Sequence, residues 1–177
     1  MKKHIICIVL LMSLILCSCS AEDTGAYQSQ FDLETNQTVV FHGLILSVPT
    51  GWEENQSIKT ENETCFEEFG ASETEWKSLL GLVVYDDLVD SLEEGYQTME
   101  MMFADTEQYE ILESDDLTID GCAAKSLTAK DMNEEGFYYK QTLLEKGDQY
   151  VLISLTCKEE GTLQDYDKIM EHITVEE

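Results

Sequence analysis

Apolar residues in the first half of the folded part form short runs that polar turns separate. Residues 39–48 (VVFHGLILSV) are apolar on both faces, which predicts a strand covered on both sides. A Pro-Thr-Gly-Trp turn at residues 49–52 ends it, since proline followed two residues later by glycine is typical of a type I turn. Residues 64–69 and 79–85 predict two more strands, joined by a polar loop around residues 72–77.

A helix is predicted after these strands. Asp86 or Asp87 is its candidate N-terminal cap, because a carboxylate there accepts hydrogen bonds from free amides of the first turn. Apolar residues then recur at three- and four-residue spacing over four turns, with acidic residues between them. The stripe consists of Leu88, Leu92, Tyr96, Met99 and Phe103.

The second half predicts an antiparallel meander. Segments 109–112 and 117–119 lead to a tight turn at Asp120-Gly121. Three strands with hairpin signals between them follow, at residues 122–129, 137–144 and 150–157. The last tight turn is expected at residues 146–148, where a glycine stands between Lys146 and Asp148.

A closing helix is predicted from Thr162, with Asp165 three residues later as the capping-box partner. Its apolar stripe is Leu163, Tyr166, Ile169, Met170 and Ile173. Strands, a helix, antiparallel strands and a second helix together predict an α+β fold, with an antiparallel sheet packed by helices. We expect residues 39–177 to form this single domain, without an internal repeat.

The chain begins with the pattern of an export signal. Two lysines follow the first methionine, and residues 5–16 are apolar except for Ser13. This run is too short to span a bilayer as a helix, which takes about 20 residues. We therefore interpret residues 1–18 as a signal peptide.

The boundary of this signal resembles the bacterial lipobox. Cys19 follows the small residue Ser18, and Leu16 stands three positions before it. Cys17 fits less well, because the bulky Leu16 directly precedes it. Cleavage before Cys19 and lipidation of its thiol would anchor the protein outside the cytoplasm, since two acyl chains give lasting attachment. The alternative is an ordinary secretory signal with incidental cysteines. The polar residues after Cys19, up to residue 38, predict a tether with a flexible reach of about 25 Å.

Charge narrows the range of partners. The full chain carries a formal charge of −27, and all ten basic residues are lysines. Without residues 1–18, eight lysines stand against 37 carboxylates, for a charge of −29. Such a field repels phosphate backbones, so we expect no nucleic-acid binding. The electrostatic counterparts would be cationic partners or divalent ions; the simpler interpretation is that acidic side chains keep the domain soluble.

Three cysteines remain in the predicted domain: Cys65, Cys122 and Cys157. None belongs to a C-x-x-C motif, and three pairings are conceivable for one disulfide outside the cytoplasm. The sequence does not choose among these pairings, and each cysteine is equally well interpreted as a small buried apolar residue.

The opening of the domain resembles that of the PsbP-like superfamily. Residues 46–52 (LSVPTGW) are similar to its apolar-Pro-x-Gly-Trp pattern, and the middle helix, the turn at residues 119–121 and the closing helix are also similar. The resemblance covers about residues 39–175. It implies an α/β/α sandwich and, for most members, non-enzymatic binding or assembly work. It assigns no binding residue to a position of this chain.

Candidate chemistry is sparse, and the sequence predicts no cofactor, no catalytic set and no metal ligands. A Cys–His nucleophilic pair would need one of the three domain cysteines to meet His42 or His172. Acidic groups at Asp86, Asp87 and Asp90, at Asp115 and Asp116, and at Glu134 and Glu135 have no calcium-loop spacing. They are interpreted as helix caps or solvated turns.

Aromatic and sulfur side chains offer a few other candidates. Met99 belongs to the helix stripe, beside Met101 and Met102, and is expected in the core. Trp52 and Trp76 flank turns, and Trp52 is expected to cap the core.

These features predict a membrane-tethered, extracytoplasmic lipoprotein. Its expected role is non-catalytic binding or accessory work for an envelope protein or a cationic ligand. The alternatives are a calcium-responsive surface module and a hydrolase whose site the sequence does not reveal.

Overall fold

The computed structural model describes residues 27–70, 75–85, 90–104, 107–133 and 136–176. It contains a seven-stranded antiparallel sheet in the order β3-β4-β5-β9-β8-β7-β6. Its strands are β3 (Trp52–Glu54), β4 (Glu63–Phe69), β5 (Trp76–Tyr85), β6 (Tyr109–Ile119), β7 (Cys122–Asp131), β8 (Tyr138–Lys146) and β9 (Gln149–Cys157). A small sheet in the order β1-β2-β10 consists of β1 (Gln37–Phe41), β2 (Leu44–Val48) and β10 (Thr174–Val175).

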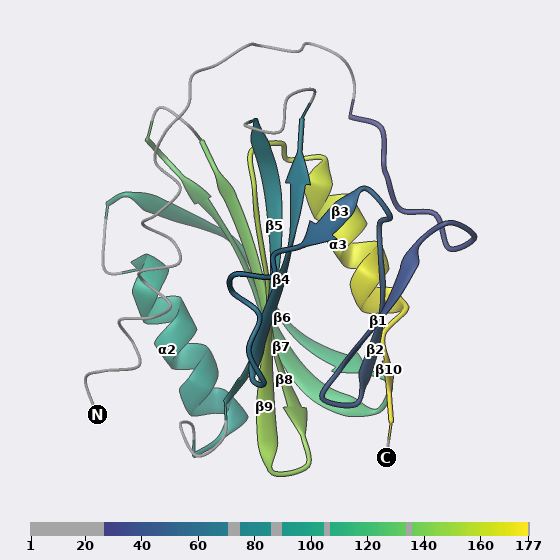
Figure 1. Cartoon of the computed structure of the whole chain (residues 1–177). Coiled ribbons are helices and arrows are strands. Elements are labelled where there is room, and N and C mark those ends of the chain that lie inside the picture. Colours follow the sequence, from purple (N-terminus) through teal and green to yellow (C-terminus); the bar gives the residue numbers. More distant parts are fainter. Residues whose placement is uncertain (1–26, 71–74, 86–89, 105–106, 134–135, 177) are drawn as a thin grey trace.

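Two helices lie on opposite faces of the large sheet (Figure 1): α2 (Leu92–Ala104) and α3 (Thr162–Glu171). The small sheet lies on the same face as α3. The fold is therefore α+β with helices on both sides of an antiparallel sheet, as expected.

Each face of the large sheet has its own core. Under α3 and the small sheet, Leu80, Leu82, Ile153 and Leu155 are fully buried. Facing pairs Leu80–Leu155 and Leu82–Ile153 stack across β5 and β9. Burying each such side chain contributes about 1.5–3 kcal/mol, so this core makes a large contribution to the stability of the domain.

The second core lies under α2. Tyr96, Met99 and Phe103 of the predicted stripe are buried against the sheet, while Leu88 lies outside the described residues. Phe103 contacts Tyr139 of β8, with ring centroids 5.7 Å apart. The three- and four-residue spacing therefore predicted the buried face correctly.

The predicted strand at residues 39–48 is wrong in one respect, since it is a hairpin. His42 and Gly43 have φ angles of +48° and +72°. Two consecutive positive φ values reverse the chain within two residues, which pairs β1 with β2. The apolar run obscured the turn because both strands contribute buried residues. The turn at Asp120-Gly121 is present as predicted, with φ angles of +45° and +85°.

Two element boundaries also differ from the prediction. Segments 109–112 and 117–119 form one continuous strand, β6, with an irregularity between Ile111 and Glu113. Helix α2 begins at Leu92, and the Ser91 hydroxyl oxygen accepts a bond of 3.2 Å from the Glu94 amide. The predicted cap at Asp86 or Asp87 is therefore wrong for α2, and both aspartates lie outside the described residues.

Candidate functional site

The segment that precedes the small sheet is fastened to α3. We call residues 27–31 the strap. Asp165, on the first turn of α3, is fully buried and accepts hydrogen bonds from the Tyr27 hydroxyl, the Ser29 hydroxyl and the Gln30 amide, the last at 3.0 Å. The sequence predicted a tether with little fixed structure up to residue 38. In the structure, Tyr27, Ser29 and Gln30 of this segment already bind the domain, and β1 begins at Gln37.

A second buried carboxylate holds the same segment. Glu68 of β4 is 5% exposed and accepts a bond from the Gln30 side-chain amide and one of 2.9 Å from the Ser78 hydroxyl. Buried carboxylates are stabilised by hydrogen bonds to the charged form. Gln30 therefore links Asp165 and Glu68, through its backbone amide and its side chain respectively.

Lys168 supplies positive charge to this network indirectly, through the Ser29 hydroxyl. Lys168 Nζ donates to the Ser29 hydroxyl oxygen at 2.7 Å, and the Ser29 hydroxyl donates to Asp165. The Tyr27 ring lies directly against Gly161, where a Cβ atom would overlap it. Burial, together with the neighbouring Asp165 carboxylate, raises the pKa of the Tyr27 hydroxyl, which therefore stays protonated and donating.

The predicted capping box at Thr162 and Asp165 is wrong. The N-cap of α3 is Gly161, and no side chain caps it. Asp165 instead faces the strap, because it lies four residues before the fully buried Ile169 and so shares the apolar side of the helix. That spacing was the signal in the sequence: an aspartate on an apolar stripe needs several buried donors.

The three domain cysteines are free. Cys65 of β4 pairs with Gly81 of β5, and Gly81 pairs with Ser154 of β9, so Cys65 and Ser154 are on the same face of the sheet. Cys157 lies three residues after Ser154 in β9, which is an odd number. Side chains alternate along a strand, so Cys65 and Cys157 face opposite sides of the sheet. Burial raises the pKa of the Cys65 thiol to about 12 and also raises that of Cys157. Both are protonated at neutral pH and poorly suited to act as nucleophiles.

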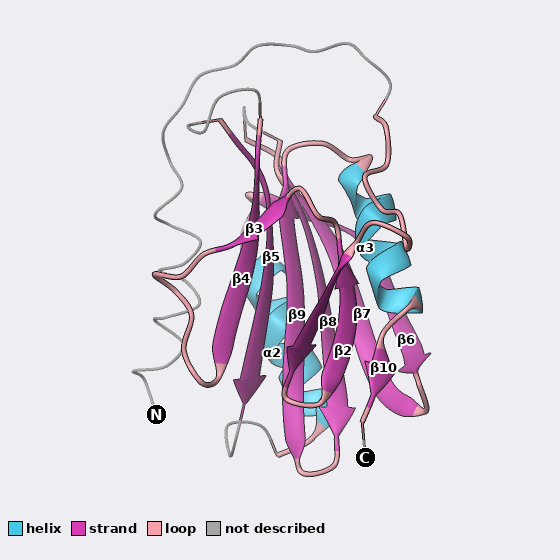
Figure 2. Ribbon diagram, turned by 45° about the vertical axis from the view of Figure 1, so that its right-hand side comes forward, coloured by secondary structure: helices cyan, strands magenta, loops and turns pink. Residues whose placement is uncertain are grey.

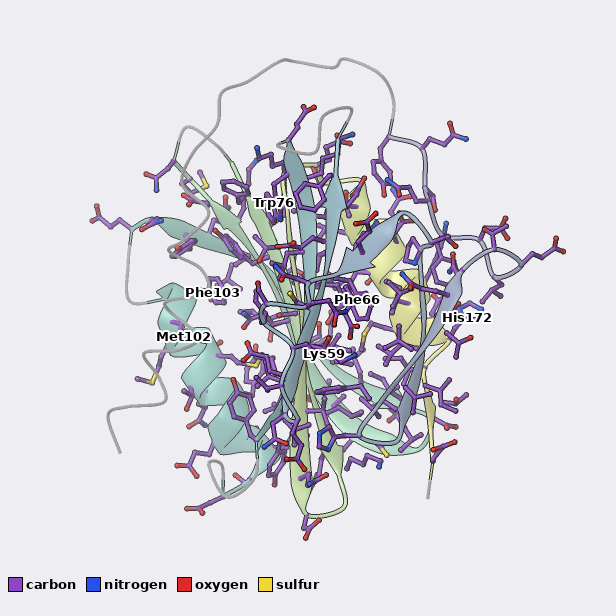
Figure 3. The ribbon with its side chains drawn as sticks, viewed as in Figure 1. Lys59, Phe66, Trp76, Met102, Phe103 and His172 are labelled. Atoms are coloured by element: carbon purple, nitrogen blue, oxygen red, sulfur yellow. The ribbon has the colours of Figure 1, made fainter. Side chains whose placement is uncertain are left out.

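The histidines are engaged with the backbone. His42 Nε2 lies 2.7 Å from the Glu61 carbonyl oxygen, and His172 Nδ1 lies 2.8 Å from that of Lys168. His172 stands at the end of α3 (Figure 3), where its ring contacts Phe31. Among the described residues, the structure records no pairing of a cysteine with a histidine.

The predicted acidic residues that the structure describes are all exposed. Asp90 is exposed before α2, Asp115 and Asp116 are exposed on β6, and residues 134 and 135 lie outside the described part. Within the described ranges, no three Asp, Glu, His or Cys side chains are placed so that they could hold a metal ion. Trp52 is 1% exposed and belongs to the core, as expected, whereas Trp76 is half-buried beside Phe137 (Figure 3).

Most of the sequence matches a known family. The model of the PsbP-like protein family matches residues 20–174. The chain belongs to the PsbP-like family. No curated protein matches it. The matched residues include the strap and every described element from β1 to α3.

Solved structures of similar shape support the PsbP-like fold. Cyanobacterial PsbP (CyanoP) from Synechocystis sp. PCC 6803 has a TM-score of 0.57 at 14% identity, with 86% of this chain and 99% of that one covered. The Ran-binding protein Mog1p of Saccharomyces cerevisiae has a TM-score of 0.58 at 14% identity, with 79% and 95% covered. LpqN, described as involved in cell envelope biogenesis of Mycobacterium tuberculosis, has a TM-score of 0.58 at 13% identity, with 82% and 95% covered.

Neither of the helices in the described part of this PsbP-like chain has the length and apolar character needed to cross a bilayer.

Proposed function

We propose that this PsbP-like chain is a lipid-anchored, extracytoplasmic accessory domain that binds an envelope protein without catalysing a reaction. The observation that carries the proposal is the strap. A buried carboxylate, Asp165, fixes the chain at Tyr27, only eight residues after the predicted lipidation site Cys19. A domain that is exported to act freely in solution has no need for a fixed attachment point so close to a lipid.

Chain geometry limits how far the domain can stand from the bilayer. Eight residues span at most about 28 Å when fully extended. The strap meets the domain at the first turn of α3, so this end of the fold would remain within that distance of the lipid. The binding surfaces of such a domain would meet membrane-associated proteins at high local concentration.

The polar groups of the fold support binding over catalysis. Asp165 binds the strap through both carboxylate oxygens, and Glu68 binds it through one oxygen while the other accepts a hydrogen bond from the Ser78 hydroxyl. Cys65 and Cys157 have raised thiol pKa values, and His42 and His172 contact backbone carbonyls. An envelope location is also supported by LpqN, which shares the fold and is described as involved in cell envelope biogenesis.

The anchor is tested by replacing one cysteine at a time in the full chain. Cys19→Ser is expected to move the protein from the membrane fraction to the soluble fraction, and mass spectrometry of the wild type is expected to show a diacylated N-terminal cysteine. Cys17→Ser is the matched control, because it makes the same substitution at the cysteine two residues earlier. This variant should stay in the membrane fraction. An unmodified Cys19 with cleavage elsewhere would overturn the proposal.

A further inference from the structure

Strand β6 forms an open edge of the large sheet. Among the described residues it pairs with β7 alone, so about every second residue directs its N–H and C=O groups away from the sheet. All seven residues from 112 to 118 are exposed, although they belong to both faces of the strand. Two of them are large and apolar, Leu112 and Leu117, at 45% and 38% exposed. Figure 2 shows β6 at the outer margin of the sheet.

This edge is strongly acidic. Residues 107–119 contain five carboxylates and no lysine. Lys125 of β7 binds Asp116 at 2.6 Å, and Lys140 of β8 lies 3.7 Å from Glu113. Each of these lysines also binds a carboxylate on a helix, so neither neutralises the edge fully. Asp115 has no ion pair with any residue in the described part of the chain.

We propose that residues 112–118 of β6 bind an extended, cationic segment of a partner protein, which adds to the sheet as an eighth, antiparallel strand. Main-chain bonds to the open edge would supply affinity, and the side chains of β6 would select the sequence. This inference specifies the class of partner in the proposed function. It depends on the proposed function only for the location of that partner outside the cytoplasm.

The alternation of side chains specifies the segment. Glu113, Asp115 and Leu117 project from one face of β6, opposite Thr128, Ser126 and Ala124 of β7. An added antiparallel strand meets them in reverse order. Its own sequence would therefore read apolar-x-basic-x-basic, with the apolar residue beside Leu117 and the basic residues beside Asp115 and Glu113.

Charge excludes the other obvious occupant, a second copy of this chain. Two β6 strands paired edge to edge would bring together two strands with four carboxylates each and no lysine. Like charges directly opposite one another destabilise a strand pair. The same field repels phosphate groups, which disfavours nucleic acids and anionic lipids.

The test uses the chain from Cys19 onward with Cys19→Ser, which contains every described residue. The probe is the peptide Thr-Val-Thr-Lys-Thr-Lys-Thr, and a peptide of the same composition ordered Lys-Lys-Thr-Thr-Val-Thr-Thr is its control. Amide hydrogen exchange and NMR titration follow residues 112–118. The alternating peptide is expected to slow exchange in this segment and to bind more tightly than the reordered one. N-methylation of its edge-facing amides should abolish binding.

Variants of the two edge strands complete the test. Asp115→Lys should weaken binding of the alternating peptide at least about tenfold. Glu53→Lys makes the same charge change on β3, the short strand at the other edge, and should leave the dissociation constant nearly unchanged. Equal binding of both peptides, or equal loss in both variants, would mean unspecific charge attraction and overturn the inference. Unchanged exchange at residues 112–118 would overturn it too, and would leave the carboxylates as protection against aggregation. None of these outcomes depends on lipidation.

Discussion

Asp165 is the side chain whose removal should change the strap most. Asp165→Ala removes three hydrogen bonds to a charged acceptor, each of which contributes about 1.5–3 kcal/mol to stability. The substitution also removes the desolvation cost of a fully buried carboxylate, which is several kcal/mol. The net loss in the free energy of unfolding should be about 2–3 kcal/mol, or roughly 5–10 °C in Tm for a domain of this size.

Two measurements distinguish local release of the strap from destabilisation of the whole domain. Urea denaturation gives the free energy of unfolding, and hydrogen exchange at the Gln30 amide, which donates to Asp165, reports strap release. We expect the Gln30 amide to lose its protection in Asp165→Ala. Glu171→Gln is the matched control, because it removes an exposed charge from the same helix and should change stability by less than about 0.5 kcal/mol.

A double-mutant cycle with Tyr27→Phe isolates one contact of the strap. This substitution keeps the ring beside Gly161 and removes only the hydroxyl that donates to Asp165. It should cost about 1–2 kcal/mol alone and much less in the Asp165→Ala background, because the acceptor is already gone. If Asp165→Ala unfolds like Glu171→Gln and Gln30 stays protected, the account of the strap is wrong.

Three further predictions concern the core and the charges. Iodoacetamide at pH 8 should modify the half-buried Cys122 in the native protein, while Cys65 and Cys157 should react only in urea. Burial raises the pKa of both thiols, and at a pKa of about 12 only about one Cys65 thiol in 10⁴ is ionised at pH 8. Rapid labelling of Cys65 in the native protein would contradict this prediction. The pKa of Tyr166 is raised by burial, so above pH 10 the unfolded chain loses a proton that the folded one keeps, and stability falls by up to about 1.4 kcal/mol per pH unit. Tyr166→Phe should lower the free energy of unfolding at pH 7 by about 1–2 kcal/mol, since the Tyr166 hydroxyl forms hydrogen bonds with Thr142 and the Ile153 carbonyl. Above pH 10, urea titrations should show the stability of this variant falling less steeply with pH than that of the wild type. An equally steep fall would refute the role of Tyr166 in this pH dependence. Calcium and magnesium at equal ionic strength should raise Tm equally, and a rise of several degrees with calcium alone would reveal a site that the described residues do not form.

Most elements of the fold could be predicted from the sequence because their signals are local. The stripe of Tyr96, Met99 and Phe103 fixed which side of α2 is buried, since residues three and four apart share a helix face. The glycine at Gly121 marked a two-residue reversal that both flanking strands required. The sequence pattern missed the reversal at His42-Gly43, because the apolar residues around it continue without a polar break.

Contacts between segments that are distant along the chain could not be predicted from the sequence pattern. Asp165 has the spacing of a capping-box residue, and only the return of the strap, more than 130 residues away along the chain, shows that it binds Tyr27 and Ser29 instead. The opposite orientations of Cys65 and Cys157 likewise follow from strand order and register.

The sequence by itself determined the candidate export signal, the acidic charge, the succession of a strand region, a helix, an antiparallel meander and a closing helix, and the buried side of each of these helices. These properties depend on composition and on periodicities of two and 3.6 residues, which neighbouring residues encode. Only the tertiary structure decided that the strap binds two buried carboxylates and that the long, acidic strand β6 lies at an edge of the large sheet. Both depend on which segments meet in space, and that is set by packing over the whole domain.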